Sequence, residues 1–217
     1  MKSFLIDTST EALIIILMED DKIIDYHYEM IKRDHSTLLM PSLDNLLTRN
    51  QIDIKNIKRI IVASGPGSYT GVRIGVTVAK TLSYTLNIPL YQVSTLELMA
   101  CSFIEKAKYI MPIIDARRGN VFGALYQVNN NQLIPLYPDQ LYSFTELLDN
   151  AKKETQDKVL VVGLGEVNIP DNQFTYLKVS DYFNPQMVFN LNITEVENVH
   201  TFVPNYKRKA EAEMNLK

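Results

Sequence analysis

Residues 64–75 read Ser-Gly-Pro-Gly-Ser-Tyr-Thr-Gly-Val-Arg-Ile-Gly, and they hold four of the eight glycines in this 217-residue chain. An apolar run at 57–63 precedes them and a helical pattern at 72–86 follows. A strand that feeds a glycine-rich turn and then a helix points backbone N–H groups outward, which is the geometry of an anion site. The segment therefore predicts a strand–turn–helix unit of an α/β protein.

Two known phosphate-binding loops do not match this segment. A Walker loop needs Gly-Lys-Ser/Thr, and here Gly71 is followed by Val and Arg; the third glycine of a dinucleotide fingerprint would have to fall one position earlier. Gly65, Gly67 and Ser68 are therefore weak nucleotide candidates, with an ordinary tight connection as the equal alternative.

Three small residues, Gly71, Gly75 and Ala79, recur every fourth position along the predicted helix. A glycine inside a helix costs about 1 kcal/mol relative to alanine, so a bare stripe suggests close approach of another helix. The spacing leaves open whether that helix belongs to this chain or to a partner.

The order of elements on either side of the loop indicates a duplication. Three strands, a helix and a strand occur in the first half and again in the second, although the halves share no evident sequence. The expected strands are 4–7, 13–18, 23–29, 57–63, 89–93, 110–115, 121–128, 132–136 and 158–162, and the expected helices are 35–49, 72–86, one capped by Ser94 and one from 143 to about 153. We expect two α/β units, 1–105 and 106–217, the second of them degenerate after about residue 166, where only a weak helix at 185–191 and a helical tail at 204–217 are indicated.

Composition excludes several classes of protein. Hydrophobic residues make up 46% and charged residues 22%, and the net charge of -3 argues against a dedicated nucleic-acid-binding surface. Cys101, the single cysteine, lies in an apolar stretch and is interpreted as a core residue, and the three histidines have no i, i+4 pair to bind a metal. With no leader-like segment and no apolar run of about 20 residues, we expect a cytoplasmic protein with no membrane span.

The turn at residues 7–10, Asp-Thr-Ser-Thr, is a second place where a phosphate site is conceivable. An acid at the end of a first strand, followed by hydroxyls, can hold a metal-bound phosphate, so Asp7 and Thr8 join the weak nucleotide candidates. No lysine or glutamine in the turn reaches a phosphate, which favours a simple turn cap. The turn at 115–119, Asp-Ala-Arg-Arg-Gly, is its counterpart in the second half.

The glycine segment resembles the hallmark of the TsaB/YeaZ family, the non-catalytic partner in bacterial synthesis of tRNA threonylcarbamoyladenosine. Matching pieces occur in the family's order from residue 3 to about 209. They are Ile6-Asp7-Thr8-Ser9, His35-Ser36 with Leu39 and Pro41, Val93-Ser94-Thr95-Leu96, Ile114-Asp115-Ala116-Arg117-Arg118, and Pro204 with Tyr206 and Arg208.

The resemblance implies an actin-like ATPase fold, of the sugar kinase, Hsp70 and actin class, made of two RNase-H-like units with mixed sheets. It implies pairing with the transferase TsaD, which holds a metal through an H-x-x-x-H motif that this chain lacks, and with the ATPase TsaE. On this reading the chain is not an enzyme, binds no cofactor or metal firmly, and contacts tRNA only through the complex, while ATP and a metal ion serve the partner subunits.

The resemblance also implies which surface meets the partner. In the family the first two helices pack against the transferase, and the same face forms a homodimer when no partner is present. Carried over, this interface is predicted at Leu39, Leu43, Leu46, Gly71, Arg73, Gly75 and Ala79.

Two rival functions follow from the same residues. One is an actin-like enzyme that hydrolyses nucleotide by itself, with Asp7 and the glycine loop around the phosphates; the other is a protease. The missing phosphate lysine argues against the first, and the absence of a nucleophile motif around Cys101 argues against the second.

Overall fold

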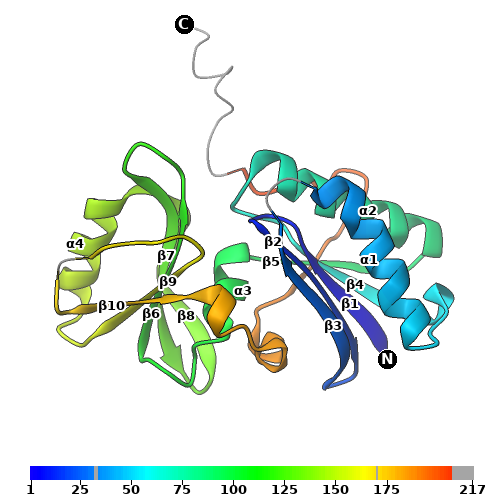
Figure 1. Ribbon diagram of the computed structural model, residues 1–217, viewed down its shortest axis with the longest axis horizontal. Coiled ribbons are helices and arrows are strands. Elements are labelled where there is room, and N and C mark those ends of the chain that lie inside the picture. The colour runs from blue at the N-terminus through cyan, green and yellow to red at the C-terminus, as the bar shows by residue number, and fades with distance from the viewer. Residues whose placement is uncertain (32–33, 170, 207–217) are drawn as a thin grey trace, which may run out of the picture.

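The computed structural model describes residues 1–31, 34–169 and 171–206, and it consists of two mixed α/β units joined through a central helix (Figure 1). The first sheet has the strand order β11-β5-β4-β1-β2-β3. Its strands are β1 (Lys2–Asp7), β2 (Ala12–Glu19), β3 (Lys22–Met30), β4 (Ile57–Ala63), β5 (Leu90–Val93) and β11 (Thr194–Glu195). Its helices are α1 (His35–Arg49), α2 (Tyr69–Leu86) and α3 (Thr95–Cys101), with a short 3-10 helix, η1 (Ile54–Asn56), before β4.

The first sheet is buried on both faces, which explains why β1, β2 and β4 are almost continuously apolar. On one face, Phe4 and Ile6 of β1 pack in a cluster with apolar side chains of α1 and α2. On the other face, Leu5 packs in a cluster with residues of α3. The alternation of side chains along a strand thus divides one apolar run between two cores.

The second sheet has the order β10-β9-β6-β7-β8. Its strands are β6 (Tyr109–Asp115), β7 (Asn120–Asn129), β8 (Gln132–Ser143), β9 (Val159–Gly163) and β10 (Phe174–Lys178). Helix α4 (Phe144–Glu154) covers its outer face with Leu147 and Ala151. The inner face shares a core with α3, because Ile110 and Leu160 belong to the same cluster as Leu96.

Strand pairing confirms the duplicated plan. β1 lies antiparallel to β2 and parallel to β4, and β6 lies antiparallel to β7 and parallel to β9. The turns correspond as well: Asp7 Oδ1 accepts from the N–H of Ser9 at 2.7 Å, and Asp115 Oδ1 accepts from the N–H of Arg117 at 2.8 Å. The two units form the actin-like fold expected from the sequence.

The end of the described chain returns to the first unit, which differs from the predicted division at residue 106. After β10 come two short 3-10 helices, η2 (Val179–Asp181) and η3 (Pro185–Asn190), and then β11, which pairs antiparallel with β5. We call residues 196–206, which continue along the first unit, the C-terminal strap. Val196, Val199 and Phe202 of the strap pack against the cluster beneath α1 and α2. The strap therefore belongs structurally to the first unit.

The predicted elements agree with the observed ones in type, and the differences fall at boundaries and after residue 166. α2 begins three residues earlier than expected because Ser68 caps it, and β8 extends to residue 143. β10 and β11 were not expected, and the weak helix at 185–191 is η3. The predicted tail helix lies mostly outside the described residues, as does Arg208. Among the helices of the described ranges, none has the length and apolar character to cross a bilayer.

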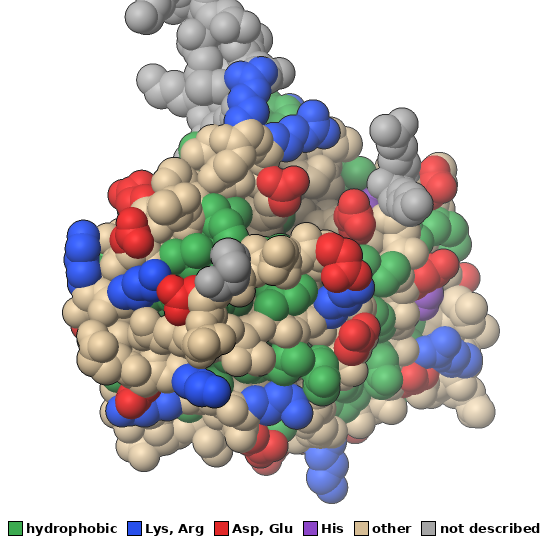
Figure 2. Space-filling view, turned by 60° about the vertical axis from the view of Figure 1, so that its left-hand side comes forward, with side chains coloured by type: hydrophobic (Ala, Val, Ile, Leu, Met, Phe, Trp, Pro, Cys, Tyr) green, Lys and Arg blue, Asp and Glu red, His purple; other side chains and the backbone are tan. Residues whose placement is uncertain are grey.

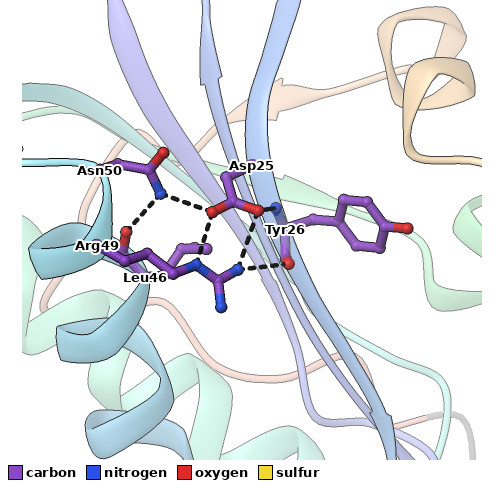
Figure 3. Close-up of polar contacts among 5 residues, drawn as sticks. All are labelled: Asp25, Tyr26, Leu46, Arg49 and Asn50. Atoms are coloured by element: carbon purple, nitrogen blue, oxygen red, sulfur yellow. Dashed lines mark hydrogen bonds and ion pairs between the residues drawn. The ribbon is translucent and has the colours of Figure 1, made fainter.

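Strand β3 is an edge strand of the first sheet, and one ionic cluster closes part of that edge (Figure 3). Arg49 binds Asp25 through Nε at 2.7 Å and Nη2 at 2.9 Å, and Nη2 also donates to the carbonyl of Tyr26 at 3.0 Å. The N–H of Tyr26 donates to Asp25 at 2.7 Å, and Asn50 joins Asp25 to the carbonyl of Leu46. Both backbone polar groups of Tyr26 are thus occupied, so this part of β3 is hindered from pairing with another strand.

Candidate functional site

The glycine loop, residues 64–68, is tied to the β1–β2 turn. Ser68 caps α2 by accepting from the N–H of Gly71 at 3.2 Å, and its own N–H donates to the carbonyl of Ser9 at 2.7 Å. Gly65 has a φ of +104°, a conformation that favours glycine. The loop therefore packs on a neighbouring turn of its own chain.

The other glycines of the segment permit backbone-to-backbone contact with that turn. A Cβ atom would lie 2.2 Å from the carbonyl oxygen of Ser9 at Gly67, and 2.1 Å from that of Thr8 at Gly71. At Gly75 it would lie 2.5 Å from Oγ1 of Thr8, whose hydroxyl donates to the carbonyl of Gly71 at 2.7 Å. These three glycines are explained by packing within the chain.

The prediction that the small-residue stripe faces a partner is therefore wrong. Gly71 and Gly75 are covered by the β1–β2 turn, and Ala79 is completely buried in the cluster beneath α1 and α2. The reason is the orientation of α2, which turns its bare side toward β1 and the turn that follows it. Arg73 is the exception among the α2 residues of that prediction, because it is exposed.

The three leucines predicted to meet a partner are also core residues. Leu39, Leu43 and Leu46 are at most 1% exposed and pack with β1 and β2. Their helical spacing marks the inward side of α1, so the opposite side is the one available for contact.

Asp7 and its neighbours form a closed hydrogen-bond network. The Asp7 carboxylate accepts from both the N–H and the hydroxyl of Ser9, and Thr95 Oγ1 donates to Ser9 Oγ at 2.8 Å. Burial raises the pKa of Asp7 to about 6, against the opposing effect of the Ser9 hydrogen bonds. Ser9 donates both of its hydrogen bonds to Oδ1 of Asp7, and this geometry supports the turn-cap interpretation.

A small cavity lies between the units beside Asp7, and its walls are mostly apolar. Side chains from β2, β3, α3 and the segment after β9 line it, among them Tyr28, Met99 and Phe183. Such a lining offers little to a nucleotide phosphate. Within the described ranges, no group of three His, Cys, Asp or Glu side chains is arranged to hold a metal ion. The nucleotide candidates thus lie close together, and the hydrogen bonds of Asp7, Thr8 and Ser68 go to Ser9 and Gly71 of this chain. These candidates are Asp7, Thr8, Gly65, Gly67 and Ser68.

The outward side of α1 and α2 forms a continuous candidate surface, since the two helices lie next to each other on one face of the first sheet (Figure 1). Its large exposed side chains include Met40 of α1, with 45% of its surface accessible, and Tyr84 of α2, with 67%. Helix α2 adds exposed Thr77 and Thr81 and half-buried Val78. Sequence reasoning missed these residues because it assigned the strongest apolar periodicity to the partner rather than to the core.

A polar cluster joins the two units near the start of α3. Asp139 of β8 accepts from Ser94 and from the hydroxyl of Tyr126, the latter at 2.6 Å. Glu97 accepts from the backbone and side-chain N–H groups of Asn192 at 2.8 and 2.7 Å, and burial raises its pKa. These contacts join residues up to 95 positions apart, and only the sequence signal of the Ser94 cap pointed to this cluster.

Cys101 is a core residue, as predicted. Its side chain is fully buried in the cluster shared by both units, and burial raises the pKa of its thiol to about 12. A thiol in this environment is a poor nucleophile, which gives no support to the protease reading.

Comparison with known proteins places this architecture among tRNA-modifying proteins. The family model described as TsaD, tRNA N6-adenosine threonylcarbamoyltransferase, matches residues 27–180. The chain is 39% identical to the tRNA threonylcarbamoyladenosine biosynthesis protein TsaB of Bacillus subtilis, over 96% of this chain and 94% of that protein. It is 31% identical to Escherichia coli TsaB, over 79% and 74% of the two chains. The solved structure of YeaZ from Pseudomonas aeruginosa superimposes with a TM-score of 0.62 at 24% identity, covering 82% of this chain and 74% of that one.

Proposed function

Because the chain belongs to the TsaB/YeaZ family of tRNA threonylcarbamoyladenosine biosynthesis proteins, we propose that it is the non-catalytic partner of a TsaD-type transferase. The transferase moves a threonylcarbamoyl group from its adenylate to the adenosine beside the anticodon. In this scheme the chain supplies a binding surface, while the partner subunits use ATP and a metal ion.

The observation that carries this proposal is the filled glycine loop. In a nucleotide-hydrolysing relative the loop and the first β-turn would both present N–H groups to phosphate. Here Ser9 and Thr8 occupy the space beside Gly67 and Gly71, and Ser9 donates two hydrogen bonds to Oδ1 of Asp7. The arrangement supports a role in holding the first unit rigid behind α1 and α2.

We infer that the outward side of α1 and α2 is the surface that meets the transferase. It offers exposed Met40 and Tyr84 together with exposed threonines of α2, a mixture suited to a helix–helix contact. The same surface would serve for a homodimer when the partner is absent, and a TsaE-type ATPase would join the assembled pair.

Transfer RNA is expected to be held mainly by the partner. The net charge is -3, and Figure 2 shows Lys and Arg interspersed with Asp and Glu on the face drawn there. Tight RNA binding by one chain generally requires a concentrated basic surface.

The proposal is tested by reconstituting the modification with the transferase, the ATPase, the adenylate-forming synthase, threonine, bicarbonate, ATP and unmodified tRNA. The modified nucleoside is measured by mass spectrometry with this chain present, omitted, or replaced by a Met40→Asp variant. The control is Thr10→Ser, a conservative change in the buried β1–β2 turn, which covers the inward side of α2.

Loss of product on omission, and reduced product with Met40→Asp but not with Thr10→Ser, is the expected result. Undiminished product without the chain would contradict the accessory role. Magnesium-dependent ATP hydrolysis by the isolated chain, abolished by Asp7→Asn, would instead support the rival reading of an independent actin-like enzyme.

A further inference from the structure

Arg73, on the first turns of α2, is held between two tyrosine rings from distant parts of the chain. Its guanidinium carbon lies 4.0 Å from the ring centroid of Tyr69 and 5.5 Å from that of Tyr206. Its Nε donates to the Tyr206 hydroxyl at 2.6 Å, and the two rings contact each other with centroids 5.1 Å apart. All three side chains are exposed, so an ordered cation stands on the protein surface.

The C-terminal strap supplies Tyr206 and is firmly anchored beside α2. Lys80 donates to the carbonyls of His200 at 3.1 Å and Phe202 at 2.6 Å, and the N–H of Asn205 donates to the carbonyl of Ser64 at 2.7 Å. The ring of Tyr206 is therefore a fixed wall for Arg73.

Among the described residues, no Asp or Glu pairs with the charge of Arg73. Helix α2 contains no Asp or Glu, and the described residues give Arg73 hydrogen-bonding and electrostatic interactions with tyrosines only. Lys80, the other cation of α2, is already bound to strap carbonyls. The Nε of the guanidinium donates to the Tyr206 hydroxyl, and its interactions among the described residues are confined to Tyr206 and Tyr69.

We propose that Arg73, clamped by Tyr69 and Tyr206, is a specificity-determining contact that binds a carboxylate side chain of the partner protein. This inference rests on the proposed function and extends it, because it makes the C-terminal strap part of the interface together with α1 and α2.

Three physical reasons favour a carboxylate. A planar guanidinium pairs with a carboxylate through two parallel N–H···O bonds. Stacking on tyrosine covers the flat face of the guanidinium and leaves the N–H groups at its edge accessible. Arg73 is already ordered in the free chain, so binding loses less side-chain entropy than at a mobile arginine. A phosphate backbone would be expected to need several cations, whereas the clamp holds one.

The test measures affinity of the full chain for the transferase subunit by calorimetry at low and high salt, without tRNA. Arg73→Gln removes the charge, and Arg73→Lys keeps the charge but removes the planar pair of N–H donors. Tyr206→Phe removes the hydroxyl but keeps the ring. Lys106→Gln is the matched control, since Lys106 makes a similar contact with Tyr182, at 4.8 Å from the ring centroid, outside α2 and the strap. Circular dichroism confirms that each variant is folded.

We expect Arg73→Gln to weaken binding on the order of tenfold and to flatten its salt dependence. Arg73→Lys recovers only part of the affinity, Tyr206→Phe causes a smaller loss, and Lys106→Gln binds like the wild type. The inference is overturned if folded Arg73→Gln binds the transferase normally, or if it weakens binding with an unchanged salt dependence. Failure of the wild-type chain to bind the transferase at all would refute the proposed function itself.

Discussion

Replacing Gly71 with alanine should destabilise the folded protein, although alanine is the better helix former. The added Cβ would lie 2.1 Å from the carbonyl oxygen of Thr8, a backbone atom that cannot rotate away. The β1–β2 turn and α2 would have to separate by more than about 1 Å to reach ordinary van der Waals distance. That movement also disturbs the 2.7 Å hydrogen bond from Thr8 Oγ1 to the carbonyl of Gly71.

The magnitude follows from three contributions. Overpacking a buried site costs about 1–3 kcal/mol, and weakening a buried hydrogen bond costs about 1 kcal/mol. Helix propensity returns about 1 kcal/mol, which leaves a net loss of about 2 kcal/mol. For a chain of this size, that corresponds to a fall in Tm of about 4–8 °C.

Urea unfolding and thermal melting of the Gly71→Ala variant check this reasoning. Gly165→Ala is the matched control, because a Cβ at Gly165 meets no atom within 4 Å. Equal stability of both variants and the wild type would refute the close-contact account of the glycine segment. A Gly71→Ala protein that is fully stable but fails to bind the transferase would restore the view that this stripe faces a partner.

Three further outcomes are expected. First, folding raises the pKa of Asp7 from 3.8 to about 6, so the folded state holds the proton more tightly than the unfolded state does. The free energy of unfolding should therefore fall by up to about 3 kcal/mol as the pH rises from about 4 to about 6. Urea unfolding below and above this pH range should show the fall in the wild type and not in Asp7→Asn, and a flat wild-type profile would contradict the prediction. Second, Tyr126→Phe removes the 2.6 Å hydrogen bond to Asp139 and should cost about 1–2 kcal/mol, with faster amide exchange at the start of α3; unchanged exchange in α3 would show that this contact does not hold the units together. Third, Arg49→Ala uncovers the carbonyl of Tyr26 on the β3 edge and should produce concentration-dependent association in sedimentation experiments. Lys108→Ala, which removes an exposed ion pair in the second unit, should not cause association. If neither variant associates, the edge is protected by other features.

Much of the secondary structure was predictable because the relevant signals are local. The apolar runs of β1, β2 and β4, and the caps at Ser94 and Ser143, are visible in neighbouring residues. The region after residue 166 was not predictable, because β10 and β11 are short and are stabilised by pairing with strands already in place. Their sequences carry little intrinsic preference of their own.

The sites were predicted less well than the fold, and the errors have one physical origin. Leu39 and Gly75 were recognised as special, but spacing along a helix defines a face without stating what that face contacts. The structure shows that both faces in question look inward. Asp139 carried no signal and Tyr206 was singled out only by the family resemblance, because their partners Ser94 and Arg73 are 45 and 133 residues away in the chain.

The sequence alone determined the order of strands and helices as far as β9, the duplicated α/β plan, the burial of Cys101 and the membership of a family. These depend on local periodicity, composition and motif, which the unfolded chain already carries. Only the tertiary structure decided that the glycine segment packs against Thr8 and Ser9, that the strap returns to α2, and that Arg73 stands ordered between two tyrosines. Those properties arise from contacts between residues far apart in the chain, which exist only once the sheets have assembled and set the distances between them.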